Sequence, residues 1–214
     1  MAYKKSGETR GRILEAAASL FEERGYYDTS MGDIAREAGI GRASVYYHFE
    51  DKERVARALF DSITEQLHAA AARALGEDGD VLLKTLIDYL LLFKHIALNK
   101  ATQAVYYDLV HFADYDKVNI ERLKNSYFRD AKRLAAAYGG SIDDKHLVAS
   151  ILTSDAFAKA LFKGILKGSL DFSLEEAMDY FCRHVILCEI RIPEAEYQAK
   201  LAEAFRICEG ILIE

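Results

Sequence analysis

The 214-residue sequence has very little proline, no tryptophan and few cysteines. Pro193 is the single proline, and because proline disrupts helix interiors, this scarcity favours a helical fold. The three cysteines, Cys182, Cys188 and Cys208, form no C-x-x-C pair. A sparse, odd set of this kind is typical of free thiols in a reducing compartment, so we expect a cytoplasmic protein.

Long apolar runs are also missing. Charged residues interrupt the first thirty positions, so no signal peptide is expected there. The most apolar stretch, residues 81–96, contains Lys84, Asp88 and Lys94, and no segment is expected to span a membrane. The composition is 51% hydrophobic and 29% charged, which is typical of a globular protein with a core of its own.

The net charge of −6 excludes a uniformly basic protein. Positive charge is concentrated in residues 1–12, where Lys4, Lys5, Arg10 and Arg12 stand against Glu8. A basic N-terminal arm is a common electrostatic footprint for contact with nucleic-acid phosphates. The alternative interpretation is a solvated, frayed terminus.

Apolar residues recur at helical spacing almost throughout, and no alternation of period two persists. One stripe at i, i+4, i+8 and i+12 comprises Val55, Leu59, Ile63 and Leu67. Segments before residue 51 are short, whereas later ones run longer between breaks. We therefore predict an all-α fold with a small three-helix domain at 1–51. A connecting helix over 51–75 is expected to follow. It leads into a larger helical domain, and this second domain spans 52–214.

Residues 30–49 have the features of a helix-turn-helix. Ser30 with Asp33 three residues on resembles a capping box at a helix start. Gly39 is placed to end that helix in left-handed conformation, and Gly41 to cap the next. Val45, like Phe49 four residues later, is expected to point back into the core.

The outward face of the second helix is then predicted to meet DNA. Its residues are Arg42, Ala43, Ser44, Tyr46, Tyr47 and His48. The guanidinium of Arg42 can donate two hydrogen bonds to a guanine in the major groove. The polar groups of the tyrosines and histidine suit phosphate oxygens, as does Lys52 at a helix start that already favours anions.

These residues lie in a stretch that resembles the DNA-binding domain of the TetR family of bacterial regulators. The similar segments within residues 10–59 read RILEAAASLFEERGYYDTSMGDIA and AGIGRASVYYHFEDKERV. The resemblance implies phosphate contacts by Tyr46, Tyr47, His48 and Lys52, base contacts near Arg42, Ala43 and Ser44, and further backbone contacts at Thr29 and Ser30. Gly32 and Gly41 depart from the family pattern, which affects the expected base preference.

The resemblance also implies an effector pocket in the central helices. We expect it to be lined by Phe93, Tyr107, His111 and Tyr127 and to take a small, largely apolar or aromatic effector. The alternative is that these aromatic side chains only fill the core, as aromatics at helical spacing usually do.

The family uses its last two main helices for a two-fold dimer interface, and segments 142–167 and 173–191 match them by position. Small residues there, Ala156, Ala160 and Gly164, permit close helix approach. A self-complementary homodimer interface is therefore expected at these helices. After Pro193, an amphipathic helix over 194–213 is expected to pack on the body or to extend the interface.

Together these features predict a repressor that binds a palindromic operator in double-stranded DNA as a homodimer and is released by its effector. Three alternatives stay open: a helical body that binds protein partners, an all-helical enzyme, and an activator. No catalytic motif or cofactor-binding loop is present in the sequence, so no enzyme activity and no cofactor are expected. His184 and Cys188 share a helix face that is suited to zinc, but a packed face without metal is favoured.

Overall fold

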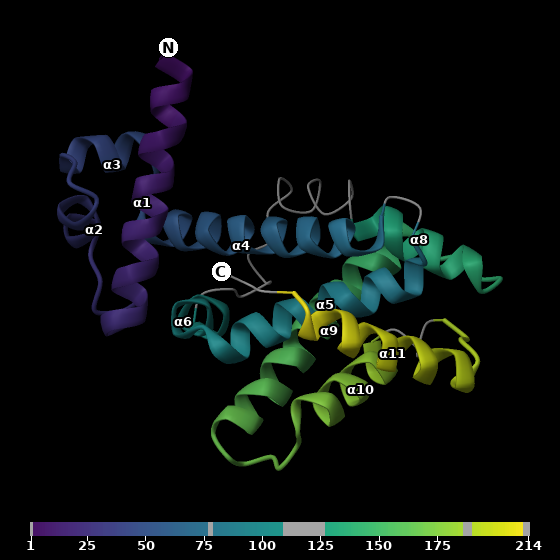
Figure 1. Ribbon diagram of the computed structural model, residues 1–214. Coiled ribbons are helices and arrows are strands. Elements are labelled where there is room, and N and C mark those ends of the chain that lie inside the picture. The colour runs from purple at the N-terminus through teal and green to yellow at the C-terminus, as the bar shows by residue number, and fades with distance from the viewer. Residues whose placement is uncertain (1, 77–78, 109–126, 186–189, 212–214) are drawn as a thin grey trace. The chain divides into compact units, whose positions relative to one another are not determined.

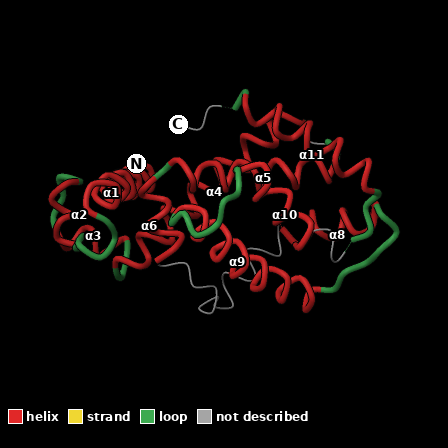
Figure 2. The backbone as a smooth tube through the Cα atoms, turned by 90° about the horizontal axis from the view of Figure 1, so that it is seen from below, coloured by secondary structure: helices red, strands yellow, loops and turns green. Residues whose placement is uncertain are grey.

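The computed structural model describes residues 2–76, 79–108, 127–185 and 190–211, and these are helices joined by loops (Figures 1 and 2). The helices are α1 (Ala2–Arg24), α2 (Met31–Glu37), α3 (Arg42–His48), α4 (Lys52–Leu75), α5 (Val81–Leu98), α6 (Lys100–Asp108), α8 (Tyr127–Ala137), α9 (Asp144–Leu166), α10 (Leu174–Val185) and α11 (Glu194–Glu209). No strand occurs within these ranges, and the all-α prediction is confirmed for them. None of the described helices is both long and apolar enough to cross a membrane.

Contacts divide the chain into two compact units. The first comprises Met1–Gln66 with His95–Val110, and the second Leu67–Lys94 with His111–Glu214. Helices α4 and α5 therefore each contribute residues to both units. The functional division into domains 1–51 and 52–214 stays a prediction.

In the first unit, α1 packs against α2 and α6, and α2 packs against α3. The apolar face of α1 is fully withdrawn from solvent, with Ile13 and Ala17 at 0% exposure and Leu20 at 2%. Helix α1 begins at Ala2, so residues 2–12 form its first turns, and phosphate contact by this basic segment stays a prediction. The predicted three-helix head with a connecting helix after it is confirmed, whereas α1, with 23 residues, is longer than the short helices predicted before residue 51.

Aromatic side chains form the core of the second unit. The ring of Phe93 on α5 stacks on that of Phe162 on α9, with 4.2 Å between centroids. Phe181 on α10 meets Phe93 edge-on at 4.9 Å, and Tyr89 meets Phe181 at 5.2 Å. Such ring pairs stabilise the packing of helices by more than the burial of their apolar area alone would.

The C-terminal helix α11 packs on the second unit, in agreement with the prediction. Tyr197 is completely buried, and the ammonium of Lys94 donates to the Cys208 carbonyl at 2.9 Å. The guanidinium of Arg183 on α10 forms two hydrogen bonds to Glu194, at 2.6 and 2.9 Å. Apolar burial and these polar contacts together hold α11 against α5 and α10.

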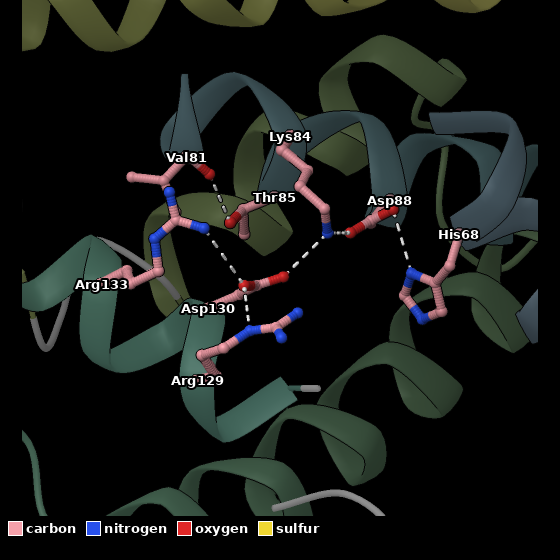
Figure 3. A network of polar contacts seen from close by, with 8 residues as sticks. All are labelled: His68, Val81, Lys84, Thr85, Asp88, Arg129, Asp130 and Arg133. Atoms are coloured by element: carbon pink, nitrogen blue, oxygen red, sulfur yellow. Dashed lines mark hydrogen bonds and ion pairs between the residues drawn. The ribbon is translucent and has the colours of Figure 1, made fainter. Parts of the chain in front are cut away.

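A polar network in the second unit connects α4, α5 and α8 (Figure 3). The ammonium of Lys84 donates to Asp88 at 2.8 Å and to Asp130 at 2.9 Å, and His68 lies 3.0 Å from Asp88. Burial alone would lower the pKa of Lys84, but its hydrogen bonds to the two carboxylates outweigh burial and raise it. Burial likewise opposes, but does not cancel, the lowering of the Asp130 pKa by Lys84.

Candidate DNA-binding site

The first helix of the helix-turn-helix, α2, begins with the predicted capping box. The Ser30 hydroxyl accepts a hydrogen bond from the Asp33 amide at 3.1 Å, and the Asp33 carboxylate accepts one from the Ser30 amide at 3.0 Å. Hydrogen bonds from the Ser30 side chain and backbone hold the pKa of Asp33 below its ordinary value. These bonds satisfy amides that a helix start otherwise leaves unpaired, so they define where α2 begins.

The turn between α2 and α3 also has the predicted chemistry. Gly39 has a φ of +63°, a left-handed conformation that favours glycine, and Gly41 is the N-cap of α3. The Ile40 amide donates to the Ala35 carbonyl at 3.0 Å, which closes the turn. Ala35 and Val45 are buried, and the burial of Val45 was predicted from the sequence.

One face of α3 points to solvent. Tyr47 is 83% exposed and Tyr46 51% exposed, whereas Val45 and Phe49 are buried. Arg42 and Ala43 are exposed, and Ser44 and His48 are half-buried. The structure thus brings the six predicted α3 residues onto one short helix, with two large polar aromatics unusually open to solvent. Their contact with DNA stays a prediction.

Two cations of the basic N-terminal region brace this helix-turn-helix. The Arg12 guanidinium donates to the carbonyl of Ala38, at the C-terminal end of α2. A cation is favourable there because carbonyl groups at a helix end carry partial negative charge. The Arg10 guanidinium lies over the Phe49 ring, 5.3 Å from its centroid. For Arg10 and Arg12 the sequence predicted either phosphate contact or a place in a frayed terminus. It gave no sign of these contacts inside the protein.

Lys52 is engaged with the loop that precedes α2. Its ammonium donates to the carbonyls of Tyr26 and Thr29, each at 2.6 Å, and lies 4.0 Å from the Tyr26 ring centroid. A third carbonyl, that of Tyr27, is 3.4 Å away. Desolvation lowers the pKa of Lys52, an effect that Asp28 only partly opposes. The sequence predicted a phosphate contact for this residue, and these partners indicate a role inside the protein.

Thr29 faces the interior. Its side chain is buried, and its hydroxyl donates to the Gly25 carbonyl at 2.8 Å. A DNA contact by this hydroxyl would require it to leave that position. Ser30, the next residue, is exposed, so of this predicted pair only Ser30 has its side chain on the surface.

The predicted effector residues are only partly described. Phe93 lies in the aromatic core of the second unit, and burial raises the pKa of Tyr107 to about 12. His111 and the side chain of Tyr127 lie outside the described residues, as does Cys188 of the candidate zinc pair. Phe93 and Tyr107 belong to different units, and the effector pocket stays a prediction.

Comparison with known proteins finds a family that matches the N-terminal helices. Residues 13–59 match the family of bacterial regulatory proteins designated tetR. The HTH-type transcriptional regulator TtgR of Pseudomonas putida is 32% identical over 134 residues. That alignment covers 61% of this chain and 63% of TtgR, so it spans less than two thirds of the relative.

Two solved structures share the fold over nearly the whole chain. TylP, a TetR regulator from Streptomyces fradiae, is 25% identical with a TM-score of 0.58, over 95% of this chain and 97% of TylP. RolR in complex with resorcinol is 20% identical with a TM-score of 0.64, over 99% of this chain and 98% of RolR. The second likeness shows the fold alone.

Residues 13–59, which contain the helix-turn-helix, therefore match the TetR family of bacterial regulatory proteins, as the sequence resemblance predicted. The relative TtgR is an HTH-type transcriptional regulator.

Proposed function

We propose that this chain is a DNA-binding transcriptional regulator, specifically a repressor that binds a palindromic operator as a homodimer and is released by a small effector. The observation that carries the proposal is the division of α3 into two faces. Val45 at 0% exposure anchors the helix, while Tyr47 at 83% and Tyr46 at 51% project from it. Exposing two large aromatics on one short helix is uncommon unless that surface binds a partner.

The chemistry of this surface suits double-stranded DNA. Arg42, Ala43 and Ser44 at the start of α3 combine one long guanidinium with two small side chains, which allows close approach to base edges. The hydroxyls of Tyr46 and Tyr47 can donate to phosphate oxygens that position the protein on the duplex. His48 and the exposed Ser30 would complete the proposed backbone contacts. Lys52 contributes through the loop that it holds.

A homodimer is supported by apolar side chains on α9, α10 and the turn between them. The exposed residues there are Leu152, Leu166, Leu170, Leu174 and Tyr180. Exposed apolar surface on two adjacent helices, which pack on each other, is typical of a binding face. A two-fold interface uses the same patch on both copies, so α9 and α10 of each copy would form a four-helix contact.

An effector is supported by a structural relative. RolR, whose fold this chain shares, binds resorcinol, a small aromatic molecule. In the proposed mechanism an effector bound in the helical body displaces α4 or α5, both of which have residues in the DNA-reading unit. The distance between the DNA-binding helix-turn-helix domains of the two copies then changes. The effector must bind the DNA-free form more tightly, because a ligand with equal affinity for both forms shifts nothing.

The direct test is binding of the full chain to fluorescent duplexes that tile the region upstream of its own gene. One duplex containing an inverted repeat should bind far more tightly than the others at physiological salt, by roughly 10³-fold or more. Equal affinity for every duplex would contradict the proposal. A matched Tyr47→Phe variant should retain the preference and lose part of the affinity.

A further inference from the structure

Gly32 and Arg42 are in close contact across the helix-turn-helix, between the neighbouring helices α2 and α3 (Figure 1). A Cβ atom placed on Gly32 would lie 3.0 Å from Nη2 of Arg42 and 3.1 Å from both Cζ and Nε. A Cβ atom at position 32 would therefore be crowded by the Arg42 guanidinium, which would have to shift by a few tenths of an ångström.

The backbone gives no reason for glycine at this position. Gly32 lies in the first turn of α2 and is not among the described glycines with positive φ, unlike Gly39 in the following turn. Glycine within a helix costs stability relative to alanine. What the missing side chain does provide is room for a guanidinium that comes from α3.

We propose that Gly32 is a specificity-determining residue, because its missing side chain lets the Arg42 guanidinium rest on α2 and so sets the direction in which Arg42 meets a base pair. This inference rests on the proposed DNA-binding function. A guanidinium is a planar fork, and bidentate contact with N7 and O6 of a guanine requires the fork to face the base edge correctly. Resting on α2 restrains a long, exposed side chain before DNA arrives, which reduces the entropy lost on binding.

Gly32→Ala is a mild way to disturb this contact. The crowded atoms are the far end of a flexible side chain, so the variant should fold, and alanine also favours the helix. The guanidinium must then shift by a few tenths of an ångström from its place over α2, which changes the direction of its planar fork. We expect the sequence preference to change at the base pair that Arg42 reads, while affinity for unrelated DNA and its salt dependence stay as they are.

The experiment is selection from a randomised double-stranded DNA library with the full chain, in parallel for wild type, Gly32→Ala, Arg42→Ala and the double variant. Gly11→Ala is the matched control, because a Cβ there meets nothing within 4 Å. Arg42→Ala should weaken binding to the wild-type site by roughly 5- to 150-fold and relax one base pair in each half-site. Gly32→Ala should alter the same base pair, and the double variant should behave like Arg42→Ala alone.

Two failures are distinguishable. Wild-type protein that enriches no sequence would contradict the proposed function, and this inference with it. Wild-type protein that enriches a site, with Gly32→Ala enriching the same site at the same affinity, would overturn the inference alone. A Gly32→Ala change at a base pair other than the one that Arg42→Ala relaxes would also overturn it. Thermal unfolding of Gly32→Ala at or above the wild-type temperature confirms that the variant is folded.

Discussion

The ammonium of Lys52, at the start of α4, lies 2.6 Å from the carbonyl oxygen of Thr29, which directly precedes the cap of α2. Since hydrogen bonds to a charged group contribute about 1.5–3 kcal/mol, Lys52→Met should lower the free energy of unfolding by about that amount. Because loop carbonyls already bind this ammonium, the slope of log affinity against log salt should not change. Urea unfolding and DNA titrations at several salt concentrations measure both quantities.

Lys145→Met, which removes one exposed positive charge in the second unit, is the control for net charge and should change neither quantity. A Lys52→Met protein of unchanged stability whose salt slope falls by about one would instead establish the direct phosphate contact that the sequence predicted.

Tyr47→Phe removes a hydroxyl from the most exposed aromatic side chain of α3. The free energy of unfolding should stay within about 0.5 kcal/mol of wild type, since the side chain packs against little. Affinity for the selected duplex should fall by about 0.5–1.5 kcal/mol, the contribution of one hydrogen bond to phosphate. Fluorescence anisotropy measures the affinity. Tyr138→Phe, in the second unit, should leave DNA affinity unchanged, and equal effects of the two variants would argue against α3 as the DNA-contacting helix.

Asp130 should contribute stability that depends on pH. Its pKa in the folded protein lies below the ordinary value, because Lys84 outweighs the effect of burial. A carboxylate of this kind stabilises the fold above its unfolded pKa, near 3.9, and that contribution is lost as pH falls through the lower folded pKa. Asp130→Asn should therefore cost about 1–3 kcal/mol at pH 7 and reduce the loss of stability below pH ~4.

Unfolding monitored by circular dichroism between pH 7 and pH 2 tests this prediction. Glu22→Gln, an exposed carboxylate on α1, is the control and should follow the wild-type curve. An Asp130→Asn curve parallel to wild type throughout the acid range would show that the network in Figure 3 contributes no pH-dependent stability.

Tyr180→Glu tests the proposed dimer. Tyr180 is partly exposed on α10, where its ring lies 4.2 Å from His184 and 5.7 Å from Phe157 between centroids. A carboxylate placed in a self-complementary apolar interface meets its own copy and must be desolvated, so the variant should sediment as a monomer. Leu98→Glu, at an even more exposed apolar position on α5, should remain a dimer. Equal mass for both variants would argue against α10 as the interface.

The parts of the site that follow from local chemistry were predictable. Ser30 and Asp33 form their capping box within four consecutive residues. Gly39 follows the end of α2 in a left-handed conformation, which glycine adopts readily. The burial of Val45 follows from the spacing of apolar residues along one short helix. These features depend on residues close in sequence, so patterns of residue type are enough to find them.

The contacts that the sequence did not reveal join residues far apart. Arg12 and Ala38 are 26 residues apart, as are Lys52 and Tyr26, and nothing local indicates that a cation will find those carbonyls. The interior position of Thr29 likewise depends on the end of α1 folding over it. Aromatics such as Phe93 fill a core or line a pocket with the same spacing, so sequence alone left that choice open.

The decisive measurement is the mass of the complex that the wild-type chain forms on the duplex enriched from a randomised library. A homodimeric repressor should enrich an inverted repeat whose half-sites lie about 34–36 Å apart along one face of the duplex, with two chains bound. A single chain bound to one half-site, or no enriched sequence at all, would contradict it.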